Sequence, residues 1–263
     1  MRVVGVFDSG LGGLITARLL TVRAPGVAIH YYGDTAHLPY GDKSPAQIRS
    51  YVREIVRFLV EAGAESIAIA CNTASAVAVD VAQAVAGSLP VFDAISPALK
   101  LLSSKTFPEP IGVVGTYTTI RSGIYGEHLR AKGYEVKELA TPVLVPLIEE
   151  GWVDHPATEA ALRTYLDALG EVGTLLLACT HYPLLLSPIR RYYRERGWNV
   201  SILSTAALLA DAVAEALAPP VLGSAETAST FWVSDLSPRF LQLAAHFWGA
   251  PLELRESSAV MLS

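Results

Sequence analysis

The chain has 263 residues, a length that accommodates one or two domains with a sizeable core. Apolar residues make up 51% of it and charged residues only 17%, a composition that excludes a disordered chain. Its 25 Asp and Glu residues outnumber 20 Lys and Arg residues, and the basic residues form no block, so we expect no nucleic-acid partner.

The high apolar content raises the question of a membrane span. A spanning helix needs roughly 18 to 20 consecutive apolar residues, and the longest uncharged stretch, 172–189, is interrupted by Thr180, His181 and Pro183. The first ten residues enter a strand-like pattern at once and lack the zones of a signal peptide. We therefore expect no membrane partner and a cytoplasmic location, where the two cysteines stay thiols rather than forming a disulfide.

Short apolar runs alternate with helical patterns along the chain, which predicts α/β architecture with parallel sheets. The predicted strands are 3–7, 29–32, 66–70, 111–115, 174–178 and 200–203. A helix opens after the first strand at about residue 13, and another begins after Ser44. Further helices are predicted at 74–86, about 121–132, 157–169, 206–216 and 239–247.

The helix after Ser44 carries the clearest local signals. Ser44 and Gln47 have the spacing of a capping box, and Pro45 occupies the first helical position. Its apolar residues recur at helical spacing on one face, ready to cover a sheet; they are Ile48, Val52, Ile55 and Leu59.

Two segments of the first half recur in the second half. Residues 111–116 resemble 4–9, and 178–180 resemble 70–72 at nearly the same offset. This internal repeat predicts two pseudo-symmetric lobes, each a mainly parallel sheet flanked by helices. Ligand sites in such sheets lie beyond the carboxyl ends of the strands, so the site is expected in the cleft between the lobes.

The boundary between the lobes is expected near residue 95, just before a cluster of prolines. The segment after about residue 205 has no counterpart in the internal repeat and is expected to return to the first lobe. The first lobe would then comprise 1–95 plus 206–263, with Asp8, Tyr40 and Cys71. The second would comprise 96–205, with Thr116, Glu149 and Cys179.

A glycine-rich turn, residues 8–13, joins the first strand to its helix, where backbone N–H groups form an anion-binding site. The main alternative interpretation is a dinucleotide-binding motif, in which Asp34, about 20 residues further along the chain, would be the acidic residue. It is disfavoured because Ile15 stands in the third glycine's place and Asp8 would face the pyrophosphate. A merely structural turn stays open as an alternative to a small-ligand site.

Cys71 and Cys179 are the two cysteines, and each follows a buried strand at a hydroxyl-rich helix entry. A free cysteine is most often a small buried hydrophobe, but matching positions in the repeat favour a functional pair. Two thiols facing one cleft suit removal of a proton from one face of a carbon and its return to the other. Dithiol redox chemistry is disfavoured because no C-x-x-C motif is present.

Asp8, Glu149 and His181 are the titratable groups expected near the thiols, although Glu149 alone would more often be a solvated turn residue. The loop within 31–41 is rich in glycine and proline and could clamp a ligand; an ordinary surface loop is the alternative. The six histidines show no metal-ligand spacing, so we predict no metal.

Together these segments resemble the glutamate racemase family, whose members interconvert L- and D-glutamate without a cofactor and supply D-glutamate for peptidoglycan. The matching segments are 7–13, 32–34 with 39–41, 71–75, 115–119 and 179–185. The resemblance implies two pseudo-symmetric α/β domains with glutamate between them, no cofactor, and a homodimer. Aspartate racemases share the architecture but carry Glu where this chain has His181, which favours glutamate.

The resemblance also implies roles for individual residues. Cys71 and Cys179 would be the acid/base pair, with Asp8 assisting one thiol and His181 with Glu149 the other. Substrate contacts would come from Asp8, Ser9, Pro39, Tyr40, Gly41, Asn72, Thr73, Thr116, Thr119, Thr180 and His181. Among these, Tyr40 and Gly41 would hold the side-chain carboxylate, and Asn72, Thr73 and Thr180 the α-carboxylate. Ser204 departs from the family pattern, which has an aspartate there.

Two other functions compete with glutamate racemisation. A non-catalytic bilobal binding protein for an acidic amino acid would share the cleft, but it would be insensitive to thiol alkylation. Within enzymes, an aspartate racemase or a related decarboxylase is the runner-up, and a decarboxylase of this fold is expected to use one thiol.

Overall fold

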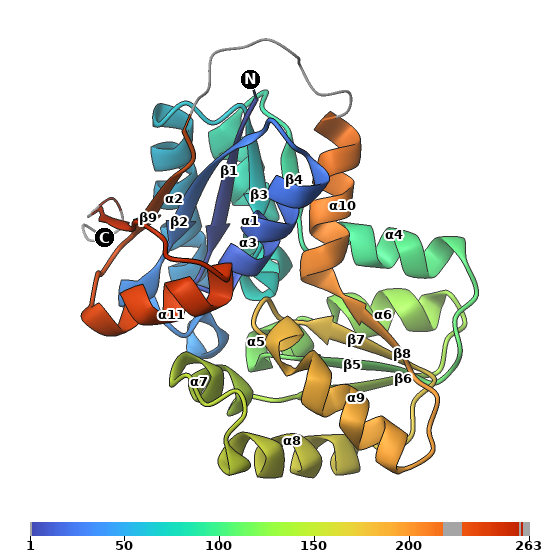
Figure 1. Ribbon diagram of the computed structural model, residues 1–263. Coiled ribbons are helices and arrows are strands. Elements are labelled where there is room, and N and C mark those ends of the chain that lie inside the picture. Colours follow the sequence, from blue (N-terminus) through green and yellow to red (C-terminus); the bar gives the residue numbers. More distant parts are fainter. Residues whose placement is uncertain (1, 218–227, 258, 260–263) are drawn as a thin grey trace.

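The computed structural model describes residues 2–217, 228–257 and 259. Within them the strands form two sheets, one in each of two lobes (Figure 1). All the strand pairings are parallel. The predicted α/β class with two parallel sheets flanked by helices is therefore confirmed.

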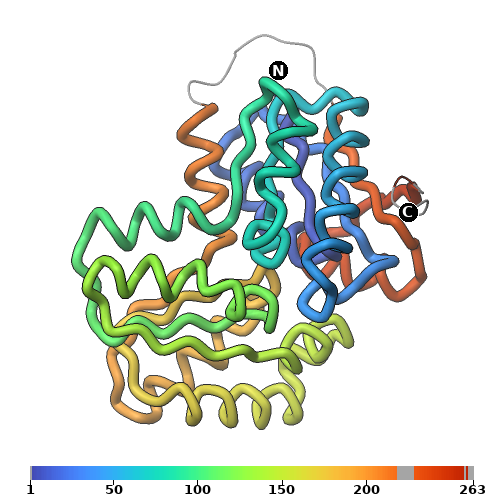
Figure 2. The backbone as a smooth tube through the Cα atoms, turned by 180° about the vertical axis from the view of Figure 1, so that it is seen from behind, coloured from blue at the N-terminus to red at the C-terminus, as the bar shows by residue number. Residues whose placement is uncertain are grey.

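The first lobe is built on a six-stranded sheet of order β10-β9-β2-β1-β3-β4. Its strands are β1 (Val3–Asp8), β2 (Ala28–Gly33), β3 (Ser66–Ile69), β4 (Val91–Asp93), β9 (Thr230–Val233) and β10 (Arg255–Glu256). Its helices are α1 (Gly13–Arg23), α2 (Pro45–Glu61), α3 (Asn72–Ala86), α10 (Thr205–Leu217) and α11 (Pro238–Trp248). Segments far apart in the sequence thus lie side by side, as the blue and red parts of the tube show in Figure 2.

The second lobe is built on a four-stranded sheet of order β6-β5-β7-β8. Its strands are β5 (Ile111–Gly115), β6 (Val136–Ala140), β7 (Thr174–Ala178) and β8 (Ser201–Ser204). Its helices are α5 (Tyr117–Arg121), α6 (Ile124–Ala131), α7 (Leu144–Glu149), α8 (Pro156–Leu169) and α9 (Leu186–Glu195), and α4 (Ser96–Ser104) lies beside α6 and α10. The exact division of the chain into domains stays a prediction, and 218–227, 258 and 260–263 of its last segment lie outside the described residues.

Local sequence chemistry explains where helices begin. The capping box at the start of α2 is formed as predicted, with the Ser44 side chain accepting from the Gln47 backbone N–H. The predicted apolar face of α2 is buried. In α3 the N-cap position is held by Cys71, whose sulfur accepts from the backbone N–H of Ala74 at 3.4 Å.

The helix predicted at about residues 121–132 is present as α6 over Ile124–Ala131, but it begins later than predicted. Residues 121–132 do not form a single helix, because Gly123 adopts a left-handed conformation with φ +70° and separates α5 from α6. Thr116 caps the earlier start of α5 by accepting from the backbone N–H of Thr119. The elements that the pattern missed include β4, β6, β9, α4, α7 and α9.

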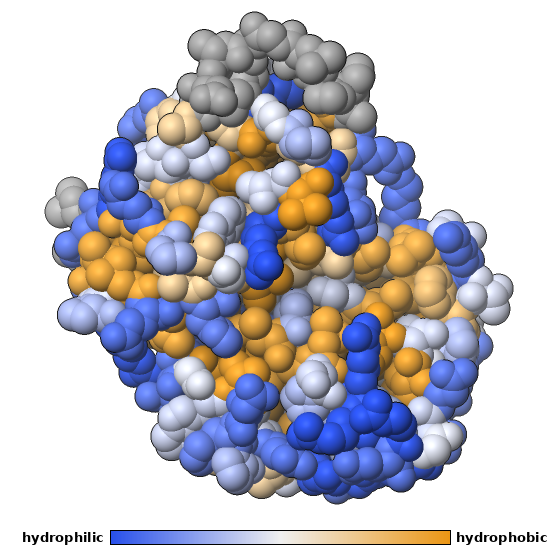
Figure 3. Space-filling view, viewed as in Figure 1, coloured by the Kyte–Doolittle hydropathy of each residue, from blue (hydrophilic) through white to orange (hydrophobic). Residues whose placement is uncertain are grey.

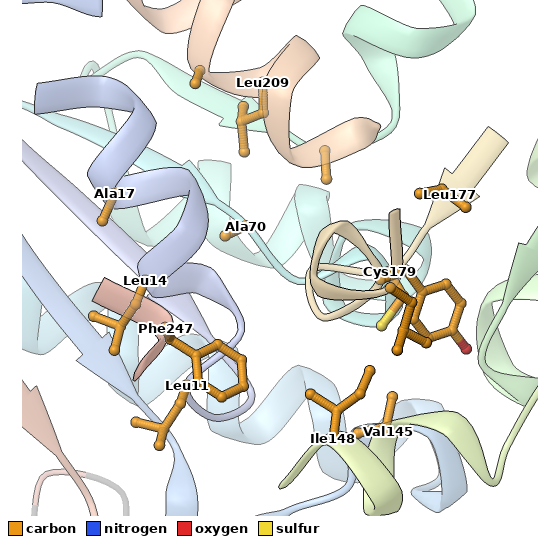
Figure 4. Close-up of a cluster of buried hydrophobic side chains, with 14 of the residues drawn as sticks. Leu11, Leu14, Ala17, Ala70, Val145, Ile148, Leu177, Cys179, Leu209 and Phe247 are labelled. Carbon is orange, nitrogen blue, oxygen red and sulfur yellow. The ribbon is translucent and has the colours of Figure 1, made fainter. Parts of the chain in front are cut away.

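The largest apolar cluster crosses from one lobe to the other. Figure 4 shows Leu11, Leu14 and Phe247 on one side, with Ile148 and Cys179 on the other. In the space-filling view apolar residues also gather along the junction of the lobes, whereas hydrophilic residues gather over α8 and α9 (Figure 3). The lobes are thus held together by packing as well as by the chain. None of the described helices combines the length and apolarity that crossing a membrane requires.

Candidate active site

The two cysteines line one cavity between the lobes. Cys71 stands at the N-terminus of α3, shortly after β3, and Cys179 directly follows β7. Both thiols are buried, with 4% and 5% of the residue exposed. Both lobes contribute to the wall of this cavity.

Most residues that the sequence singled out line this cavity. They are Ser9, Pro39, Tyr40, Gly41, Cys71, Asn72, Thr73, Thr116, Cys179, Thr180 and His181. Sequence reasoning missed six lining residues, namely Leu38, Asp42, Tyr117, Pro142, Val145 and Ala178. Four of them are chain neighbours of predicted residues, whereas Pro142 and Val145 come from a loop and helix that carried no recognisable motif.

Asp8, Thr119 and Glu149 do not line the cavity; each lies behind a residue that does. Asp8 accepts from the Thr180 hydroxyl, Thr119 contacts Thr116, and Glu149 contacts His181. Ser204, at the end of β8, is not among the lining residues either.

Cys71 lies in surroundings that favour its neutral form. Burial raises the pKa of the Cys71 thiol to about 12, and the nearby Asp8 carboxylate adds to this effect. The backbone N–H of Ala74 opposes it, as does the Ser9 hydroxyl, which lies 3.7 Å from the sulfur and can donate to a thiolate. Cys71 is therefore a thiol at neutral pH and suits the role of proton donor.

Cys179 faces a histidine instead of a carboxylate. Its sulfur lies 3.8 Å from Nδ1 of His181, whose Nε2 lies 2.5 Å from Oε1 of Glu149. Burial lowers the pKa of His181, but the hydrogen bonds and charges of Cys179 and Glu149 outweigh it, so the pKa lies well above its usual value. His181 is therefore placed to exchange a proton with Cys179.

A chain of hydrogen bonds joins the two sides of the site. The Thr180 hydroxyl donates to Oδ1 of Asp8 at 3.2 Å and lies 3.3 Å from Nδ1 of His181. Burial raises the pKa of Asp8, against the opposing charge of His181 and hydrogen bonds from Gly10, Gly13 and Thr180. Asp8 can therefore exchange a proton more readily than an exposed aspartate.

One glycine allows this close approach of the lobes, and the next one leaves room for the Asp8 side chain. A Cβ at Gly12 would lie 2.5 Å from Oγ1 of Thr180 and 2.6 Å from Nδ1 of His181. A Cβ at Gly13 would lie 2.5 Å from Cβ of Asp8. The glycine-rich turn thus lets residues of the second lobe contact Asp8.

Three threonines meet across the opposite wall. The hydroxyls of Thr73 and Thr116 are 2.9 Å apart, and Thr119 lies 3.0 Å from Thr116 and 3.3 Å from Thr73. Thr73 belongs to the first lobe and the other two to the second. Thr73 and Thr116 line the cavity, and Thr119 lies behind them.

Both polar atoms of the Asn72 side-chain amide are hydrogen-bonded. Tyr125 donates to its oxygen at 2.7 Å, and its nitrogen donates to Thr205 at 2.8 Å. The sequence pattern contained no signal for Tyr125 or Thr205, because both contacts join distant parts of the chain. They fix the start of α3, beside Cys71.

Asp34 fixes the loop that carries Pro39, Tyr40 and Gly41. It is fully buried and accepts from the Tyr40 hydroxyl at 2.6 Å and from Ser234 at 2.8 Å, and it contacts His37 at 2.8 Å. These contacts occupy both carboxylate oxygens. Asp34 is therefore not available to bind a ribose, as the dinucleotide alternative requires.

The described residues contain no group of three His, Cys, Asp or Glu side chains that could hold a metal ion. The titratable groups at the site are its two thiols, the Asp8 and Glu149 carboxylates and His181.

Comparison with known proteins agrees with this arrangement. A family model described as Asp/Glu/Hydantoin racemase matches residues 15–213. A glutamate racemase of Neisseria meningitidis serogroup A is 39% identical over 259 residues, which cover 96% of this chain and 94% of that protein.

Two solved structures are also similar. The glutamate racemase of Francisella tularensis, in complex with D-glutamate, matches with a TM-score of 0.88 and 30% identity over 98% of each chain. That of Thermus thermophilus, in complex with β-chloro-D-alanine, matches with a TM-score of 0.84 and 35% identity over 98% of this chain and 97% of that one. The resemblance noted from the motifs is confirmed, and the chain belongs to the Asp/Glu/Hydantoin racemase family of enzymes.

Proposed function

We propose that this enzyme interconverts L- and D-glutamate by a cofactor-independent transfer of the α-proton between two thiols. The observation that carries the proposal is that Cys71 and Cys179 reach one cavity from corresponding strand ends of the two lobes. Opposite positions in one cavity are what a reaction at both faces of a single carbon requires.

In the direction that begins at Cys179, its thiolate removes the α-proton and becomes a thiol. The electron pair of the broken C–H bond stays on the α-carbon and spreads into the α-carboxylate. Cys71 then gives its proton to the opposite face and becomes a thiolate, so atoms and charge balance. The reverse direction begins with Cys71 as the base, and a proton must return before the same enantiomer can react again. We propose that Asp8, Thr180 and His181 carry it, because their hydrogen bonds link the surroundings of Cys179 to the carboxylate whose charge acts on Cys71.

The difficult step is the build-up of charge on a carboxylate that is already anionic. The N-terminus of α3 presents backbone N–H groups there, and Thr73 and Thr180 add hydroxyl donors. Donors already in place in a buried site stabilise developing charge without reorganisation. Asn72 would hold its place in this set through Tyr125 and Thr205.

The substrate's second carboxylate would contact the Pro39–Tyr40–Gly41 segment, which Asp34 fixes on the wall of the cavity. The D-glutamate in the Francisella tularensis structure supports glutamate as the substrate. We extend the proposal to supply of D-glutamate for peptidoglycan, by a homodimer in the cytoplasm. The similarity to proteins named glutamate racemase supports the formation of D-glutamate.

The test is incubation of the purified protein, freed of metal and pyridoxal, with L-glutamate in D₂O, with L-aspartate in parallel. Optical activity and the α-proton signal are followed together. Decay to the racemate with deuterium at the α-carbon is expected for glutamate and not for aspartate. Binding of glutamate without exchange would favour the binding-protein alternative, and loss of carbon dioxide would favour the decarboxylase.

A further inference from the structure

One arginine of the first lobe holds the end of the helix that carries Glu149. Arg239 lies in the first turn of α11, and its Nη2 donates to the backbone oxygen of Glu149 at 2.6 Å. The same guanidinium pairs with Oε1 of Glu150 at 2.7 Å. In Figure 1 helix α11 lies directly above α7, so these contacts bridge the two lobes.

The same helix reaches the partner of Glu149. Phe247, two turns further along α11, packs edge-on against the ring of His181, with centroids 5.6 Å apart. α11 itself rests on α1 of the first lobe. A single helix of one lobe therefore contacts both members of the His181–Glu149 pair of the other.

Glu149 depends on such support. Its Oε1 contacts His181, whereas its Oε2 is buried and has no hydrogen-bond partner among the described residues. The direction of the carboxylate is therefore set mainly by the backbone that carries it. Glu149 is the last residue of α7, where carbonyl oxygens lack partners within the helix and a cation is favourable.

We propose that Arg239 is a positioning residue, which caps the end of α7 and so holds Glu149 against His181 when the lobes are together. Proton transfer at Cys179 then depends on closure of the lobes, because the cap and the pair that it holds come from different lobes. The kinetic part of this inference rests on the proposed function.

The experiment compares Arg239→Met, Arg239→Lys, Glu149→Gln and the double variant Arg239→Met/Glu149→Gln. Arg49→Met is the matched control, because Arg49 also donates to a backbone oxygen, that of Val77, and pairs with a carboxylate, Asp80, but within the first lobe. Circular dichroism and thermal melting check that each variant folds.

We expect Arg239→Met to lower kcat/KM about tenfold, Arg239→Lys to recover most of it, and Arg49→Met to match the parent. Since Arg239 acts through Glu149, the double variant should be no slower than Glu149→Gln alone. Primary isotope effects with α-deuterated L- and D-glutamate should rise for the enantiomer whose proton Cys179 removes, and not for the other. Losses of kcat/KM that multiply in the double variant would overturn the proposal. So would isotope effects that rise equally for both enantiomers.

A second measurement needs no turnover. Iodoacetamide labelling, read by mass spectrometry at each cysteine, should show slower labelling of Cys179 relative to Cys71 in Arg239→Met and an unchanged ratio in Arg49→Met. An unchanged ratio in Arg239→Met would overturn the positioning role. If the parent protein failed to racemise glutamate, the proposed function would fall, while this labelling ratio would still decide the role of Arg239.

Discussion

Substitution of Gly12 by alanine tests whether the lobes must approach as closely as the structure shows. Gly12 has φ −58° and ψ −34°, a right-handed helical conformation that alanine adopts without strain. The effect of the added methyl group therefore comes from what it touches. It would lie 2.5 Å from Oγ1 of Thr180, about 0.9 Å short of an ordinary contact, and 2.6 Å from Nδ1 of His181.

The magnitude follows from this overlap. Overpacking of a filled site costs about 1–3 kcal/mol. Replacing glycine by alanine at a compatible position also stabilises the folded protein by about 0.4–1 kcal/mol, because it restricts the unfolded chain. This gain is the same for the open and the closed lobes, so it does not offset the overlap. Because Thr180 and His181 belong to the other lobe, the overlap is relieved by separating the lobes. A cost of about 1–3 kcal/mol against closure corresponds to a roughly 5- to 160-fold loss of the closed form.

The assay is racemisation of both enantiomers, with thermal melting on the same samples. Gly12→Ala should lower kcat/KM roughly 5- to 160-fold while Tm changes little. Gly63→Ala is the contrasting control, because Gly63 has φ +91° in open space, so alanine there should lower Tm and leave kcat/KM unchanged. Parental kcat/KM in Gly12→Ala would refute the reasoning.

Three further predictions concern single groups of the site. Tyr125→Phe should lower the free energy of unfolding in urea by about 1–3 kcal/mol and reduce activity. The reason is that it leaves the buried amide oxygen of Asn72 without its donor. An unchanged urea midpoint would contradict this. Because the pKa of His181 is raised in the folded protein, its stabilising contribution is complete below pH 6.5 and is lost as pH rises through the folded value. The stability difference between the parent and His181→Asn should therefore shrink above pH 6.5, and a constant difference would show that the pKa is not raised. With a pKa of about 12, Cys71 should be labelled by iodoacetamide about tenfold faster per pH unit between pH 8 and 10; a plateau below pH 10 would place its pKa lower.

Much of the fold was predictable because its signals are local. The parallel sheets follow from short apolar runs between helical patterns, and the start of α2 follows from Ser44, Pro45 and Gln47. Strand β6, residues Val136–Ala140, could not be found this way. It is half-buried and carries a lysine and a glutamate, so it lacks the apolar run on which strand prediction depends.

The candidate site divides in the same way. The internal repeat identified Cys71 and Cys179 as candidate site residues, because each follows a strand at a matching position. The supporting contacts made by Tyr125 and Arg239 join segments separated by dozens of residues and lie across the junction of the lobes. No local pattern reports such contacts; they exist only after both lobes have folded and packed.

The central claim is that Cys71 and Cys179 act on opposite faces of one carbon. The most direct measurement is racemisation by Cys71→Ala and by Cys179→Ala, each followed from L- and from D-glutamate, with circular dichroism to check the fold. The account predicts that each variant keeps its fold and loses racemisation in both directions. Racemisation at the parental rate by either variant would contradict it.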